Sequence, residues 1–121
     1  MANVRYMVND TESTLTFYTQ LLGFKLLERQ GPAFAIVTKD DLRLWLSGPR
    51  TSAARPMPDG RQPQPGGWNR IVVEVEDIES VVAELKKAGA TFRNEVLKGV
   101  GGKQIVVEDP SGNPIELFES A

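Results

Sequence analysis

"NVRYMVNDTES" (residues 3–13) and "RIVVEVEDIES" (residues 70–80) align without a gap, so the 121-residue chain contains an internal repeat. Each segment begins with the alternation of a strand and then changes to helical spacing. Asp10 and Asp77 stand at this change, and aspartate is a favoured helix N-cap. The repeat therefore predicts a strand followed by a helix at the start of each half.

Apolar runs after each expected helix predict three further strands in each half. Gly23 and Gly89 are plausible ends of the two helices. The strands are expected near residues 24–30, 33–38 and 42–47 in the first half, and near 91–97, 103–108 and 114–119 in the second. The predicted fold class is α+β, built from two strand-helix-strand-strand-strand modules.

A proline-rich segment, "PRTSAARPMPDGRQPQPGG" (residues 49–67), separates modules of about residues 1–48 and 68–121 within one expected domain, 1–121. It holds five of the eight prolines and cannot form a central strand or a helix. One interpretation is a flexible connector. The other is a lid, because long loops in compact domains are often functional.

The composition excludes several classes of function. With 40% hydrophobic residues, 25% charged residues and a net charge of −2, the chain is typical of a globular protein without a nucleic acid partner. No apolar run reaches the roughly 20 residues that span a bilayer, so no membrane partner is expected. The N-terminus lacks the pattern of a signal peptide, and a cytoplasmic location is the expectation. Cysteine and histidine are absent, so any metal would need oxygen ligands.

A second informative stretch is "DPSGNPIELFE" (residues 109–119). Its first residues suit a tight turn, and the rest reads as an apolar strand with one carboxylate inside it. We expect Ile115 and Leu117 to face the helix. Glu116 and Phe118 would then lie on the opposite face, where an unpaired carboxylate would be costly.

The repeated module, "FYTQLLGF" (residues 17–24) and "DPSGNPIELFE" together resemble the vicinal oxygen chelate superfamily, the group of glyoxalases, bleomycin-resistance proteins and extradiol dioxygenases. The resemblance implies paired βαβββ modules that form a U-shaped mixed sheet around a cavity, with the helices outside. Many members are homodimers that share the cavity between chains, so a homodimer is expected.

In metal-dependent relatives, the first strand of each half begins with a metal-binding histidine and the last strand supplies a glutamate. Glu116 matches that glutamate. Asn3 and Arg70 lie seven residues before the capping aspartates, where the histidines would be. A further acidic ligand of glyoxalases would come from the strand that reads "LRLWL", where Arg43 is the nearest candidate. Arginine offers only donors, so we expect no metal and no cofactor.

The carboxylate of Glu116 is predicted to pair with Arg70 or Arg43 in the space where relatives hold a metal. Taking "DLRLWL" (residues 41–46) as the counterpart of "PIELFE" places Arg43 at the position of Glu116 and Trp45 at that of Phe118. The pair could serve only to hold a half-sheet together. Alternatively, it lines a pocket and one member also contacts a ligand.

These features favour a metal-free binding protein that sequesters a small apolar or aromatic molecule, a metabolite or an antibiotic. Arginines would grip an oxygen of this ligand and tryptophans would stack on its ring, although Trp45 could instead be part of the core. The candidate ligand-binding residues are Asn3, Arg43, Trp45, Trp68, Arg70, Glu116 and Phe118.

Two alternatives stay open. The first is a glyoxalase-like or dioxygenase-like enzyme, a lyase or isomerase, in which Glu116 is the catalytic general base or a ligand of an oxygen-rich metal site. The second is a structural role, in which side chains fill the cavity.

Overall fold

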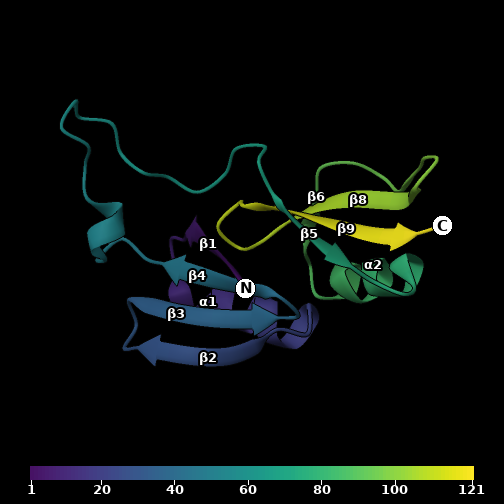
Figure 1. The fold of residues 1–121 in the computed structure, drawn as a ribbon, viewed down its shortest axis with the longest axis horizontal. Coiled ribbons are helices and arrows are strands. Elements are labelled where there is room, and N and C mark those ends of the chain that lie inside the picture. The colour runs from purple at the N-terminus through teal and green to yellow at the C-terminus, as the bar shows by residue number, and fades with distance from the viewer. The chain divides into compact units, whose positions relative to one another are not determined.

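The computed structural model describes residues 1–121, which form two compact units, residues 1–66 (the N-terminal unit) and residues 67–121 (the C-terminal unit). Each unit contains a mixed sheet with a helix on one face (Figure 1). The predicted α+β class with two strand-helix-strand-strand-strand modules is therefore confirmed. None of the helices is long and apolar enough to cross a membrane.

The N-terminal unit has a four-stranded sheet with the strand order β1-β4-β3-β2. Strands β1 and β4 are parallel, and the other neighbours are antiparallel. The elements are β1 (Ala2–Met7), α1 (Thr11–Thr16), a π-helical turn (Phe17–Leu21), β2 (Lys25–Gln30), β3 (Phe34–Lys39) and β4 (Leu42–Ser47).

Helix α1 begins where the sequence predicts, and it is the helical segment as a whole, α1 with the π-helical turn, that ends just before Gly23. The side chain of Asp10 accepts hydrogen bonds from the backbone amides of Glu12 and Ser13. The α-helix widens into the π-helical turn at Phe17, and Gly23, with φ 74°, ends it. A positive φ is a conformation that glycine adopts without strain, so Gly23 suits this position.

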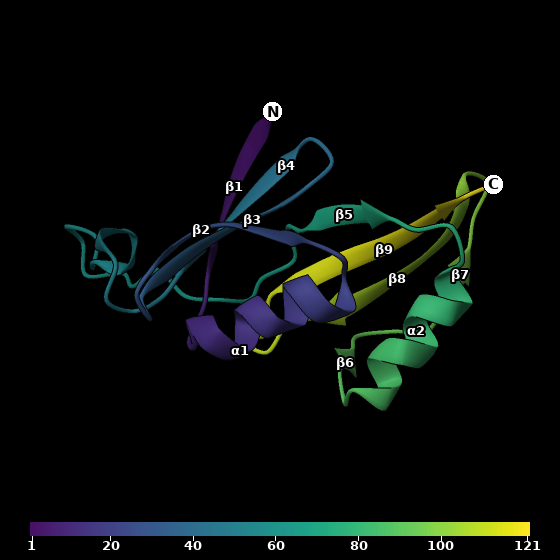
Figure 2. The same ribbon diagram turned by 90° about the horizontal axis from the view of Figure 1, so that it is seen from below.

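The C-terminal unit repeats this arrangement with the strand order β5-β9-β8-β6, and β7 pairs with β8. Strands β5 and β9 are parallel, and α2 lies along one face of the sheet (Figure 2). The elements are β5 (Ile71–Glu74), α2 (Ile78–Lys87), β6 (Thr91–Phe92), β7 (Leu97–Lys98), β8 (Gly102–Glu108) and β9 (Pro114–Ser120).

The single strand predicted over residues 91–97 is wrong, because the structure has two short strands there, β6 and β7. The amide of Val106 donates to the side-chain oxygen of Asn94 at 2.9 Å. A side chain thus takes the place of a backbone carbonyl, and the ladder to β8 is interrupted at that point.

The predicted faces of the strands agree with the burial pattern. Leu44 and Leu46 of β4 are fully buried, as are Ile115 and Leu117 of β9. The residues between them are half-buried or exposed. Each sheet therefore buries one face against its helix and presents Trp45 or Glu116 on the other.

The turn before β9 is held by Asp109, which is only 4% exposed. One of its carboxylate oxygens accepts from the amides of Ser111 and Asn113, at 2.8 and 3.0 Å. Gly112 has φ 88°, as a turn residue with no Cβ can. The tight turn predicted from "DPSGN" is therefore present.

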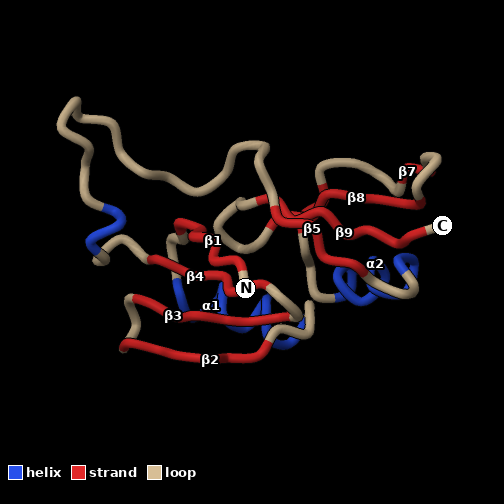
Figure 3. The backbone as a smooth tube through the Cα atoms, in the orientation of Figure 1, coloured by secondary structure: helices blue, strands red, loops and turns tan.

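The proline-rich segment contains one short 3₁₀-helix, Ser52–Ala54, and otherwise no regular structure (Figure 3). Its residues up to Gly66 belong to the N-terminal unit. The backbone amide of Met57 donates to the carbonyl of Arg61 at 2.8 Å, which closes a local turn.

Candidate ligand site

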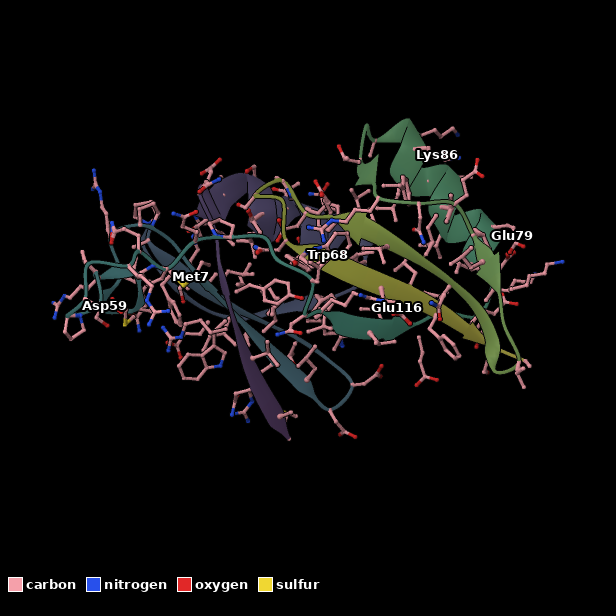
Figure 4. The ribbon with its side chains drawn as sticks, turned by 90° about the horizontal axis from the view of Figure 1, so that it is seen from above. Met7, Asp59, Trp68, Glu79, Lys86 and Glu116 are labelled. Carbon is pink, nitrogen blue, oxygen red and sulfur yellow. The ribbon has the colours of Figure 1, made fainter.

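The predicted ion pair of Glu116 is present, with Arg70 as its partner. The Nε and Nη2 atoms of Arg70 both donate to Oε1 of Glu116, at 3.1 and 2.9 Å. The side chains are 29% and 13% exposed. Arg70 Nη1 also donates to the carbonyl of Trp68 at 3.3 Å, which helps to hold the guanidinium beside Glu116. Figure 4 labels Trp68 and Glu116. The second oxygen of Glu116 accepts no hydrogen bond and remains available to a donor.

A corresponding contact joins the first and last strands of the N-terminal unit. Trp45 Nε1 donates to Oδ1 of Asn3 at 3.2 Å. Asn3 aligns with Arg70 in the internal repeat, since each lies seven residues before its capping aspartate. The contact crosses from β1 to β4, just as the Arg70–Glu116 pair crosses to β9 from the residue before β5.

Strand pairing corrects the predicted counterpart of Glu116. Arg5 of β1 is opposite Trp45, whereas Val72, the residue that aligns with Arg5, is opposite Glu116. Trp45, and not Arg43, is therefore the counterpart of Glu116. The error is two residues, and a shift of two leaves every side chain on the same face of a strand, so alternation could not reveal it.

Neither contact, Asn3–Trp45 in the N-terminal unit or Arg70–Glu116 in the C-terminal unit, has the chemistry of a site for a divalent cation. Indole and guanidinium nitrogens are donors and cannot ligate a metal. The two residues that carry oxygens already accept hydrogen bonds, Asn3 from Trp45 and Glu116 from Arg70. The chemistry that they offer is hydrogen bonding and charge pairing.

Trp68 is 71% exposed and lies just ahead of β5 (Figure 4). One face of its ring is covered by Arg93, whose Cζ is 4.5 Å from the ring centroid. Arg93 also pairs with Glu108 at 2.8 Å and donates to the carbonyls of Gly67 and Gly112, at 2.6 and 3.1 Å. Arg93 thus holds this indole while it joins the segment before β5 to the turn between β8 and β9.

Two other predicted residues have fewer contacts. Arg43 is exposed on β4 opposite Asn3, and its guanidinium makes no hydrogen bond or ion pair. Phe118 is half-buried on β9 opposite Glu74 and Gln104. Both remain predictions as ligand-binding residues.

The sequence interpretation omitted Arg5, which holds Trp45 from one side. Its Cζ is 5.1 Å from the centroid of the indole, and its Nη1 donates to Oγ of Ser47 at 3.2 Å. Phe34 of β3 meets the same indole edge-to-face, with centroids 5.8 Å apart. Asn3 and Arg5 are two residues apart in a predicted strand, so alternation places them on the same face, and this signal could have identified Arg5.

Two pockets occur within the N-terminal unit, and the proline-rich segment contributes to both. One has a volume of about 290 Å³ and lies between the end of β1, near Met7, and Pro63 and Pro65. The other, of about 340 Å³, includes Arg5 and Arg50. The segment thus forms walls of pockets in its own unit.

An acidic cluster in the C-terminal unit consists of Asp77, Glu79 and Glu119. Its charge is offset in part by Lys103, which donates to Glu79 at 2.9 Å and lies 3.9 Å from Glu119. Glu119 also accepts from the backbone amide of Ile78 at 2.8 Å. The hydrogen bond from Lys103 lowers the pKa of Glu79, and the pKa of Lys103 is raised by the same bond. This cluster therefore fastens the start of α2 to the sheet.

The fold and these positions define a family. The model of the Glyoxalase/Bleomycin resistance protein/Dioxygenase superfamily matches residues 1–117, so the chain belongs to this superfamily. A structure of a superfamily member from Sphaerobacter thermophilus has a TM-score of 0.77 at 26% identity, covering 99% of this chain and 96% of that one.

Two further relatives differ in what their names say. The chain is 28% identical over 128 residues to the probable lactoylglutathione lyase, chloroplastic, of Arabidopsis thaliana, covering 98% of this chain and 35% of the relative. The chain thus spans about a third of that curated relative. The antibiotic-binding protein TnmS3 from a Streptomyces species has a TM-score of 0.74 at 24% identity, covering 98% of this chain and 93% of that one. This second likeness shows the fold alone.

Proposed function

We propose that the protein binds and sequesters a small apolar or aromatic molecule, a metabolite or an antibiotic, without a metal. The observation that carries this proposal is the presence of two side-chain contacts, the hydrogen bond between Trp45 and Asn3 and the ion pair between Arg70 and Glu116. They stand at the positions where the resemblance implies metal ligands, and two of the four side chains can only donate.

The side chains around these contacts suit an organic ligand. Trp45 and Trp68 offer aromatic surface, and Arg43 and Arg70 offer donors to an oxygen atom. The remaining oxygen of Glu116 can accept a hydrogen bond from a ligand N–H or O–H group. Asn3 and Phe118 complete the proposed set. The likeness to an antibiotic-binding protein is consistent with this function.

A second candidate is a metal-free lyase or isomerase, favoured by the relative that is named a probable lactoylglutathione lyase. Here Glu116 would act as general base through its open oxygen, and Arg70 or Arg43 would stabilise an oxyanion. The relative is much longer than this chain, which covers 35% of it, so the same activity is only a hypothesis for this protein.

Equilibrium binding distinguishes the two candidates. Purified protein is mixed with a panel of aromatic metabolites and antibiotics, binding is followed by tryptophan fluorescence, and the ligand is then extracted and analysed by mass spectrometry. Saturable binding with the ligand recovered unchanged supports sequestration. Conversion of the ligand that Glu116→Gln abolishes, with binding retained, supports the enzyme and overturns sequestration.

We also propose a homodimer, as is common in this family, and a lid role for residues 49–67. Light scattering after size-exclusion chromatography tests the first proposal, with a monomeric mass as the contrary result. Protection of the segment from protease when ligand is bound tests the second, since a connector without contact to ligand would be cleaved at an unchanged rate.

A further inference from the structure

The pocket of about 340 Å³ is lined only by residues of the N-terminal unit. Its volume is at the lower end of the range for small-molecule sites, about 300–1,000 Å³. The lining residues that matter here are Arg5 on β1, Gln30 at the end of β2, Phe34 at the start of β3, and Arg50, Thr51 and Ser52 after β4.

The charge of this pocket is unbalanced. Arg5 and Arg50 both line it, and no aspartate or glutamate does. Arg50 makes no hydrogen bond or ion pair in the structure, and Arg5 makes no ion pair, whereas Arg29, Arg61, Arg70 and Arg93 are each paired with a carboxylate. Two guanidinium groups that line one pocket give it a positive potential, which favours binding of an anion.

The guanidinium of Arg5 is held in place by two contacts that leave most of its N–H donors available. Its Nη1 donates to Ser47, and one face of the guanidinium lies over Trp45. A guanidinium has five N–H donors, so most of them remain for a ligand. A cation whose position is already fixed loses little side-chain entropy when it binds, which favours recognition of a carboxylate in two-point geometry.

An aromatic surface adjoins these cations. Phe34 lines the pocket and packs edge-to-face on Trp45, with an interplanar angle of 84°. Gln30, Thr51 and Ser52 add neutral polar groups to the wall. The lining therefore combines two cations with one ring, and this combination matches a flat molecule with a negative oxygen group at one end.

We propose that this pocket binds the carboxylate end of an aromatic acid, with Arg5 and Arg50 on the carboxylate and Phe34 against the ring. The assignment rests on the proposed binding function and names the chemical class of its ligand. It adds Arg5, Phe34 and Arg50 to the candidate residues, and it concerns a pocket that lies within one unit.

The test is a titration with 2-naphthoate, followed by two-dimensional NMR of backbone amides and the Trp45 indole. The uncharged 2-naphthamide has the same ring and is the matched probe. Saturable shifts are expected at the lining residues with naphthoate, and binding about tenfold weaker with the amide. Arg5→Gln and Arg50→Gln should each weaken naphthoate binding by about the same factor.

Arg55→Gln is the matched control, because Arg55 is an exposed arginine of the same segment that does not line the pocket. It should bind naphthoate as the unmodified protein does. Inorganic phosphate serves as a ring-free anion. Phe34→Ala should weaken naphthoate binding but leave phosphate binding unchanged, since only the acid has a ring.

Three results would overturn the assignment. These are equal affinity for naphthoate and naphthamide, unchanged affinity in Arg50→Gln, and no saturable binding of naphthoate up to about 10 mM. Arg50 is exposed and makes no hydrogen bond or ion pair, so its variant should fold normally even if Arg5→Gln does not. If one of these three results is found while neutral aromatic ligands still bind saturably, the sequestering function stands and only this pocket assignment fails.

Discussion

In the N-terminal unit the indole of Trp45 donates to Asn3, whereas in the C-terminal unit Arg70 donates to Glu116 at the equivalent place. The first contact is a neutral hydrogen bond of 3.2 Å, and the second is an ion pair with distances of 3.1 and 2.9 Å. The direction also reverses, since the residue from the start of the unit accepts in one case and donates in the other. The repeat thus keeps the pairing between two positions while their chemistry changes.

This difference has an energetic consequence. An exposed neutral hydrogen bond adds little net stability, because water replaces either partner. A carboxylate that is largely shielded depends much more on its partner, since losing it leaves a charge poorly hydrated. The C-terminal contact should therefore matter more for folding than the N-terminal one.

The largest effect is expected for Arg70→Met. It removes the only partner of Glu116, whose side chain is 13% exposed, and should lower the free energy of unfolding by about 1–3 kcal/mol. Urea denaturation followed by circular dichroism measures this loss. Arg43→Met is the control, because that guanidinium has no partner, and it should change stability by no more than about 0.5 kcal/mol. Equal effects of the two variants would contradict the role of the pair.

A double-mutant cycle with Arg70→Met and Glu116→Gln isolates the interaction between the two side chains. A coupling energy of about 1 kcal/mol is expected, because the residues are in direct contact. The glutamine can still accept a hydrogen bond but carries no charge. If the two single effects simply add, the contact contributes nothing to folding and the comparison between units loses its basis.

For the N-terminal contact, Asn3→Ala should cost less, at most about 1 kcal/mol, since Asn3 is exposed. Trp45 is still held by Arg5 and Phe34, so its near-ultraviolet circular dichroism should be nearly unchanged. A larger loss than that of Arg70→Met would reverse the ranking of the two contacts.

Salt should separate the two contacts by their chemistry. At about 1 M salt the screening length falls to about 3 Å, so the stability difference between the unmodified protein and Arg70→Met should shrink. The difference for Asn3→Ala should stay constant, because that contact carries no charge. Parallel salt dependence of both variants would mean that charge does not distinguish the two units.

The smallest effect is expected for the exposed pair Lys103–Glu79, which shows what an ion pair does at the surface. Lys103 lowers the pKa of Glu79 by donating to it, so in Lys103→Gln that pKa should rise toward its ordinary value. A lowered folded-state pKa adds stability above the ordinary pKa of glutamate, and this is lost as the pH falls through the lowered value. Carboxylate NMR titration measures the shift, and an unchanged Glu79 pKa would contradict the contact.

The sequence predicted much of the fold because its signals are local. Capping aspartates, glycine ends of helices and two-residue alternation determine where elements begin and which face they bury. The ion pair with Arg70 followed from the same logic, since a carboxylate within an apolar strand needs a partner. Alternation has a period of two, however, so it could not distinguish Arg43 from Trp45 as the counterpart of Glu116.

Other features depend on contacts that no periodic pattern carries. The break between β6 and β7 depends on the side chain of Asn94, which replaces a backbone acceptor. The pocket near Arg5 depends on where the segment after β4 brings Arg50, and a proline-rich segment has no period from which its path could be inferred. These residues became visible only in three dimensions.

The most direct test of the central claim, that donor residues have replaced metal ligands, is the metal content of tag-free protein. Elemental analysis is combined with melting temperatures in the presence of magnesium, manganese, iron(II), nickel and zinc. We expect no stoichiometric metal and no shift, for the unmodified protein and for Glu116→Gln alike. A stoichiometric metal that stabilises the protein and is lost in Glu116→Gln would contradict the account.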